Sequence, residues 1–135
     1  MSVRRLVDTN LILRHLVQDH PAHARAAGKL FEACDQGDLV IVLVSAVLAE
    51  CLFVLESFYE HERVDISSAL STLISSPGVE INDRAVHLDA LYRYRTTSLH
   101  FVDCLVAAAA SAAKLPVASF DRGFRKFSDV SVEIE

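Results

Sequence analysis

The chain has 135 residues, the length of one ordinary domain, and a chain of this length can bury a core without disulfides. Its hydrophobic fraction of 52% and mean hydropathy of +0.31 are high for a soluble monomer, which indicates either an unusually apolar core or apolar surface that a partner covers. We favour a partner, with a dimer as the first expectation. The net charge of −5 argues against a nucleic-acid binder with a basic surface, unless several carboxylates share one site and bound cations neutralise them.

Targeting and redox features are few. The longest apolar run, residues 39–44, fits a buried strand and is too short to span a bilayer, so we expect no membrane association. The N-terminus lacks the apolar region and cleavage site of a signal peptide, which predicts a cytoplasmic protein. Cys34, Cys51 and Cys104 are widely spaced in apolar surroundings, and we expect reduced, partly buried thiols.

Hydrophobic periodicity alternates short strands with amphipathic helices along the chain. We predict strands at residues 3–7, 39–44, 79–81, 116–120 and 130–134. We predict helices at residues 10–18, 20–34, 46–59, 65–74, 83–95 and 98–113, and a short helix at residues 122–127. The expected N-caps include Ser45, Asp65 and Ser98. This alternation predicts a single α/β domain over residues 1–135, with a mostly parallel central sheet of about five short strands and helices on both faces.

Two aspartates stand at the ends of predicted strands. Asp8 follows the strand at residues 3–7, and Asp121 follows the strand at residues 116–120. Sites in parallel sheets form outside the carboxyl ends of the strands, so both carboxylates would face one crevice if the strands are neighbours. The alternative for each is a structural one, in which the side chain caps the helix that follows it.

Two further acids lie in apolar stretches. Glu50 stands between Ala49 and Cys51, and Asp103 lies within residues 101–106. An ionised carboxylate near a core is costly unless it is paired or coordinated. We expect both acids in the first turns of their helices, where the helix dipole tolerates negative charge. The structural alternative is a salt bridge to an arginine, such as Arg93 or Arg122.

Four acids that converge on one crevice repel one another, and this arrangement makes sense if they hold hard divalent cations. Mg2+ and Mn2+ favour oxygen ligands, and water and substrate phosphate complete the shell. The chemistry that we expect is phosphodiester hydrolysis by a metal-activated water.

Four segments together resemble the PIN domain and, more narrowly, the VapC-type toxins of bacterial toxin–antitoxin pairs. They are Leu6–Asn10, Ser45–Glu50, Phe101–Ala108 and Ala118–Phe124. The resemblance covers essentially the whole chain, and the order and spacing of the acids agree with the family. It implies a PIN-like fold and an endoribonuclease that uses Mg2+ or Mn2+ and leaves a 5′-phosphate and a 3′-hydroxyl.

The resemblance also assigns roles to residues and suggests partners. Asp8, Glu50, Asp103 and Asp121 would form an acidic quartet, with Asp8 and Asp103 as the principal metal ligands and the other two acting partly through water. Asn10 and Ser119 match polar positions that support the site. The family context implies an RNA substrate, a cognate antitoxin protein that blocks the groove, and a homodimer.

Cations near the acids are candidates for RNA contacts. Arg122, Arg125 and Lys126 follow Asp121 directly and could hold RNA phosphates, with a solvated helix face as the alternative. Residues 92–95 mix tyrosine and arginine, which suits single-stranded RNA but is more typical of an amphipathic helix.

Other polar and aromatic residues carry weaker signals. The histidines His20, His23 and His100 lack metal-ligand spacing, and we interpret them as ordinary surface or boundary residues. Phe53, Phe58 and Tyr59 are candidates for a dimer or antitoxin contact, with core packing as the alternative.

Two other functions compete with the nuclease. The first is a catalytically silent PIN-like module that binds RNA or a protein, against which the complete quartet argues. The second is a phosphatase or phosphoacceptor with Asp8 as its nucleophile, which needs a lysine to neutralise the phosphate. None of Lys29, Lys114 and Lys126 lies clearly at a strand end, which disfavours this reading.

Overall fold

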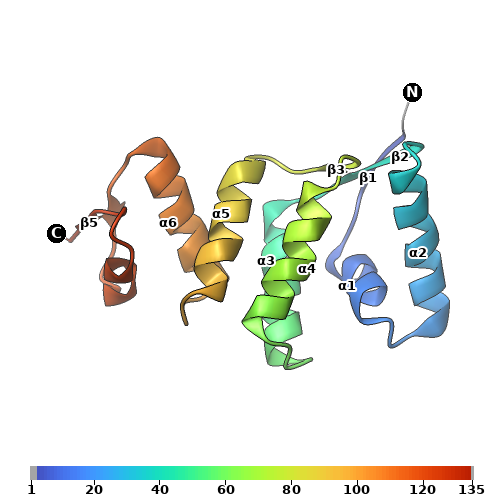
Figure 1. Ribbon diagram of the computed structural model, residues 1–135, viewed down its shortest axis with the longest axis horizontal. Helices are drawn as coiled ribbons and strands as arrows, with labels where there is room; N and C mark the ends of the chain where they lie inside the picture. The colour runs from blue at the N-terminus through green and yellow to red at the C-terminus, as the bar shows by residue number, and fades with distance from the viewer. Residues whose placement is uncertain (1–2, 135) are drawn as a thin grey trace. The chain divides into compact units, whose positions relative to one another are not determined.

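The computed structural model describes residues 3–134, and Figure 1 shows its elements in chain order. The chain divides after Asn82 into two compact units, Met1–Asn82 and Asp83–Glu135. Among the described residues, no helix is both long enough and apolar enough to cross a membrane.

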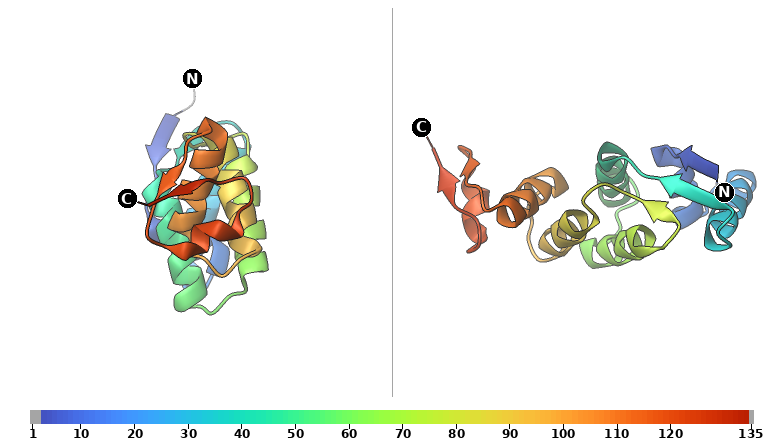
Figure 2. Two further views of the ribbon diagram at one scale, coloured as in Figure 1. Left: turned by 90° about the vertical axis from the view of Figure 1, so that its left-hand side faces the viewer. Right: turned by 90° about the horizontal axis from the view of Figure 1, so that it is seen from above.

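The first unit contains a three-stranded parallel sheet. Its elements are β1 (Val3–Leu6), α1 (Thr9–Val17), α2 (Pro21–Asp35), β2 (Leu39–Val42), α3 (Ser45–Ser57), α4 (Arg63–Ser75) and β3 (Val79–Glu80). The strand order is β1-β2-β3, which can be followed in the view from above in Figure 2. Val3 pairs with Leu39, and Ile41 pairs with Val79. Each step between neighbouring parallel strands passes through two helices, as a parallel crossover requires.

The second unit is a helix pair followed by a small sheet. Its elements are α5 (Arg84–Arg95), α6 (Phe101–Ala113), β4 (Val117–Ala118), the 3-10 helix η1 (Arg122–Lys126) and β5 (Val132–Glu133). β4 and β5 pair in parallel, with Val117 opposite Val132. The long face between α5 and α6 holds this unit together.

The α/β class and the parallel pairing predicted from the sequence are confirmed. Residues 3–134 contain five short strands, and every pairing between them is parallel. The strands are divided between one sheet of three and one of two. The strands are also shorter than predicted, because fewer residues form backbone pairs with a neighbouring strand than the apolar runs contain.

The helical spacing of apolar residues explains which face of each helix is buried. On α3, Leu48, Cys51, Leu52 and Leu55 fall at the i, i+3, i+4 and i+7 positions of one face, and all four are buried. In the second unit Tyr94 of α5 meets Phe101 of α6 edge to face, with 6.3 Å between the ring centroids. The three cysteines are buried and unpaired, as predicted.

Several predicted helix starts were wrong by one to three residues. Ser45 and Ser98 are not N-caps, because Val44 and His100 occupy those positions. The Ser98 hydroxyl instead accepts a hydrogen bond from the Lys126 ammonium, at 3.4 Å. Asp65 lies inside the first turn of α4, since that helix begins earlier than predicted.

Candidate functional site

Asp8 links the end of β1 to the start of α1. It is the N-cap of α1, and its Oδ1 accepts a hydrogen bond from the backbone N–H of Leu11 at 3.0 Å. The capping alternative is therefore realised. The side chain is exposed, and its Oδ2 has no hydrogen-bond partner within residues 3–134. Capping thus occupies one oxygen and leaves the other available to a ligand.

Glu50 is exposed on the second turn of α3, and not near the core as its apolar sequence neighbours predicted. The prediction that it falls in the first turn was wrong, because the first turn of α3 holds no acid. Its neighbour Cys51 is buried, with Sγ 4.0 Å from the carbonyl oxygen of Thr9. Burial, followed by the negative charges of Glu50 and Asp8, raises the pKa of the Cys51 thiol to about 12. Both carboxylates of the first unit therefore lie within electrostatic range of the Cys51 thiol.

The second unit positions Asp103 and Asp121. Asp103 is half-buried in the first turn of α6, as predicted, where the positive end of the helix dipole stabilises its charge. Asp121 is the N-cap of η1, and its Oδ1 accepts from the N–H of Gly123 at 2.8 Å. The N–H of Asp121 donates to the hydroxyl of Ser119 at 2.9 Å. Ser119 therefore helps to hold the turn that presents Asp121.

The turn after β4 packs on the loop that leads into α6. A Cβ added at Gly123 would lie 2.5 Å from Leu99, and Lys126 reaches Ser98 in the same loop. Asp121 thus belongs to a turn that packs beside the beginning of α6, where Asp103 lies.

The salt-bridge alternative for Glu50 and Asp103 is not realised. Arg93 is buried, and its guanidinium pairs with Asp129 and Asp89 instead. It also lies over the ring of Phe127, 4.9 Å from the centroid. Within the described chain, neither Glu50 nor Asp103 takes part in an ion pair.

The same geometry confirms the favoured interpretation of residues 92–95 as part of an amphipathic helix. Arg93 and Tyr94 are buried and belong to the core of the second unit, so this stretch is an amphipathic helix. The hydrogen bonds from Arg93 hold the pKa of Asp129 well below its usual range, which keeps this carboxylate ionised. The pair joins α5 to the chain that follows η1.

The candidate ligands are chemically suited to a hard divalent cation. All four candidate ligands are carboxylates, and oxygen donors are those that Mg2+ and Mn2+ prefer. Asp8 and Glu50 come from the first unit, and Asp103 and Asp121 come from the second. In residues 3–134, no three histidine, cysteine or acidic side chains lie together as they would around a metal ion.

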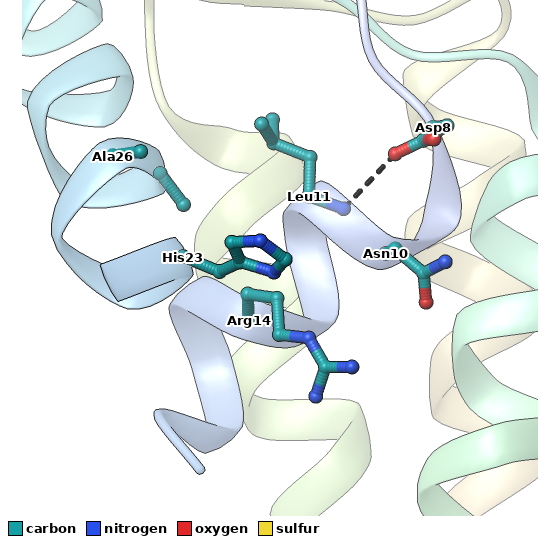
Figure 3. Close-up of a pocket in the computed structure, with 7 residues that line it drawn as sticks. Asp8, Asn10, Leu11, Arg14, His23 and Ala26 are labelled. Atoms are coloured by element: carbon teal, nitrogen blue, oxygen red, sulfur yellow. Dashed lines mark hydrogen bonds between the residues drawn. The ribbon is translucent and has the colours of Figure 1, made fainter. Parts of the chain in front are cut away.

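A hollow of about 220 Å³ opens beside Asp8, between α1 and α2 (Figure 3). Its lining residues are Asp8, Asn10, Leu11, Arg14, His23, Ala26 and Ala27. Sequence reasoning passed over Arg14 and treated His23 as an ordinary residue. The spacing of four residues from Asn10 to Arg14, which places both on one face of a helix, was the signal that could have found Arg14.

The predicted cations after Asp121 lie on η1. Arg122 and Arg125 are exposed, and no ion pair holds either of them among the residues that the structure describes. Lys126 is also exposed, although it donates to Ser98.

Comparison with known families agrees with these features. The PIN domain family model matches residues 5–130, a range that contains all four carboxylates and parts of both units. PIN domains are in general nucleases, and they typically bind divalent metal ions. A search of the curated proteins finds no match.

Proposed function

The chain belongs to the PIN-domain family, and from this premise we propose that it is an endoribonuclease that hydrolyses RNA phosphodiester bonds with Mg2+ or Mn2+. The observation that carries the proposal is that Asp8 uses only one of its two carboxylate oxygens in the cap of α1. Its Oδ1 is fixed by the start of α1, while its Oδ2 has no hydrogen-bond partner among the described residues and its side chain is exposed. A carboxylate held by one oxygen presents the other in a defined direction, as a metal ligand must be presented.

In this proposal the four acids serve one site. Asp8 and Asp103 are the principal ligands, and Glu50 and Asp121 complete the site, partly through water. A bound cation would supply an activated water and would stabilise the charge that develops on the phosphate. The chain's own contribution is to hold the carboxylates, through the α1 cap at Asp8 and the Ser119 contact at Asp121. Asn10, on the first turn of α1, supports the site from its edge.

The cations of η1 have an RNA-binding role in this proposal. Arg122 and Arg125 are exposed directly after Asp121, and Lys126 completes the group. Contacts to backbone phosphates position a strand without reading its sequence. The choice of RNA over DNA rests on the resemblance to the VapC-type toxins.

We extend the proposal to the toxin of a toxin–antitoxin pair, acting in the cytoplasm. A cognate antitoxin would block the site, and two copies of the chain would form a homodimer. The exposed rings of Phe53 and Phe58, at 66% and 75% of their full exposure, support a protein contact at the far part of α3. Tyr59 contributes less apolar surface there, since its hydroxyl donates to Asp19 at 2.9 Å.

Metal-dependent cleavage of a mixed RNA pool tests the proposal. The purified chain is incubated with Mg2+, with Mn2+ and with EDTA, beside an Asp8→Asn variant. Asp38→Asn is a matched control, because Asp38 is an exposed acid of the same unit in the turn before β2. We expect cutting in either metal, none in EDTA, and a loss of about 100-fold or more in Asp8→Asn, since even supporting groups around a metal cost 10–100-fold.

The contrary results are distinct. Cutting that survives both EDTA and Asp8→Asn would show that the acids are not the catalytic group. RNA binding without cutting in any metal would favour the silent binding module instead.

A further inference from the structure

The hollow between α1 and α2 begins at a proposed metal ligand and continues away from it. Asp8 stands at one part of its wall, and Arg14 and His23 stand at another (Figure 3). Its volume of about 220 Å³ is below the roughly 300–1,000 Å³ of pockets that enclose a whole small molecule. It therefore suits one segment of a longer ligand better than a separate small-molecule substrate.

Arg14 is held in place by a chain of hydrogen bonds. Its Nη1 donates to Oδ1 of Asp19 at 2.8 Å, and Oδ2 of Asp19 accepts from the Tyr59 hydroxyl at 2.9 Å. The Tyr59 hydrogen bond first, and then Arg14, lower the pKa of Asp19, which keeps the carboxylate ionised. These bonds tie the last turn of α1 to the chain just after α3.

This anchoring does not use every donor of the guanidinium. Arginine carries five N–H donors, and among residues 3–134 the contact with Asp19 is made by Nη1. The hydrogen bond to Asp19 raises the pKa of the Tyr59 hydroxyl, and a side-chain hydrogen bond with Arg14 acts against this rise, so Asp19 and Tyr59 both lie against the guanidinium. An arginine that is held in this way has further N–H donors with which to receive an anionic oxygen.

The rest of the hollow is suited to a base or a sugar. Leu11, Ala26 and Ala27 supply apolar surface. The ring of His23 comes from α2 and stacks on His20, with 3.8 Å between centroids, which gives it a settled orientation. Aromatic rings of this kind accept a nucleic-acid base by stacking.

Asn10 and Arg14 present polar groups along one face of α1. They are four residues apart, so one helical turn of about 5.4 Å separates them. Asp8, at the N-cap, lies beyond Asn10 on the same side of the hollow. An RNA strand that places one phosphate near Asp8 would have its neighbouring nucleotide alongside Asn10 and Arg14.

We propose that this hollow is a nucleotide subsite, which holds one nucleotide of the RNA strand next to the cleaved bond. Its phosphate binds Arg14, and its base and sugar pack against His23 and the apolar floor. Asp19 and Tyr59 are positioning residues, because they hold Arg14 and do not touch the strand. The inference rests on the proposed nuclease function, and it gives the path of the RNA strand from Asp8 along α1.

The salt dependence of RNA binding tests the subsite. All proteins carry Asp103→Asn so that the RNA remains uncut, and binding of a fluorescent single-stranded oligoribonucleotide is followed by anisotropy over a series of salt concentrations. Arg14→Gln is compared with Arg25→Gln. Arg25 is a matched control, because it is an exposed arginine on α2 that lines a separate hollow with Gln18, Pro21 and Ala24.

We expect Arg14→Gln to weaken binding about tenfold or more, the size of one lost hydrogen-bonded charge contact. The slope of log K against log salt should fall by about 0.7, the value for one phosphate contact on a single strand. Arg25→Gln should change neither quantity. A purely structural Arg14 would leave the slope as it is, so an unchanged slope in Arg14→Gln would overturn the proposal.

Two further variants keep the test decisive if Arg14→Gln folds poorly. Arg14→Lys keeps the charge and should keep the slope. His23→Ala removes an exposed ring and should weaken binding about tenfold through lost base stacking, without changing the slope. Binding by His23→Ala equal to that of its parent would contradict the subsite.

The failure of the subsite and the failure of the nuclease function are distinguishable. If the wild-type chain cuts RNA and Arg14→Gln binds like Arg25→Gln, the subsite is wrong and the nuclease stands. If the wild-type chain neither cuts nor binds RNA, the nuclease proposal falls, and the subsite falls with it.

Discussion

At the scale of single residues, helix capping and metal binding are compatible roles for one carboxylate. The sequence left them as alternatives for Asp8 and Asp121, and in both cases Oδ1 caps the turn that follows. The sequence could point to these residues because each follows an apolar strand directly. The sequence could not show which carboxylate oxygen accepts the capping hydrogen bond and which remains available, since this depends on the backbone geometry of the turn.

Because one oxygen of Asp8 caps α1 and the other is available to a metal ion, we predict that substitutions of Asp8 can change metal-dependent activity without changing stability. Asparagine is as good an N-cap as aspartate, whereas alanine offers no acceptor. Asp8→Asn should unfold in urea close to the wild type, and Asp8→Ala should lose about 0.5–2 kcal/mol of unfolding free energy. Both should be inactive. If Asp8→Asn is as unstable as Asp8→Ala, its loss of activity would not isolate the role of the metal ligand.

At the scale of elements, local patterns predicted the helices and the parallel direction of the strands, but not the division of the strands between two sheets. The start of α2 was predicted correctly from His20 and Pro21, because proline suits the first helical position. The division of five strands into two sheets could not be read from the sequence. β4 and β5 have only two residues each, and such short segments do not specify their partners.

A pair of glycines tests how tightly the elements of the first unit pack. A Cβ at Gly78, just before β3, would lie 2.4 Å from the Cys34 sulfur and 2.8 Å from its carbonyl oxygen. Gly78→Ala should therefore cost about 1–3 kcal/mol of unfolding free energy, as overpacking does. A Cβ at Gly28 in α2 would meet no atom within 4 Å.

Gly28→Ala is the matched control in the same denaturant titration. It should raise stability by about 0.5–1 kcal/mol, because alanine has the higher helix propensity. If both alanines have equal effects, the close contact between Gly78 and Cys34 would be refuted.

At the scale of the whole molecule, the catalytic proposal depends on acids from both units. The sequence singled out Asp8 and Asp121 because they follow predicted strands, and Glu50 and Asp103 because they lie in apolar stretches. It could not predict the bonds that join distant residues. Asp19 and Tyr59 are 40 residues apart, and Arg93 and Asp129 are 36 apart. These bonds explain why Arg14 was overlooked and why the salt-bridge partners of Arg93 were not predicted.

The central proposal is that Asp8 and Asp103 are the principal ligands of a divalent metal ion. The most direct measurement is a Mn2+ titration followed by electron paramagnetic resonance, which detects the free ion. The proteins are the wild type, Asp8→Asn, Asp103→Asn and the control Asp38→Asn. The account predicts that Asp8→Asn and Asp103→Asn each lose the same bound Mn2+, while Asp38→Asn binds as the wild type does. Unchanged Mn2+ binding by Asp103→Asn, with binding lost in Asp8→Asn, would contradict the assignment of Asp103 as a metal ligand.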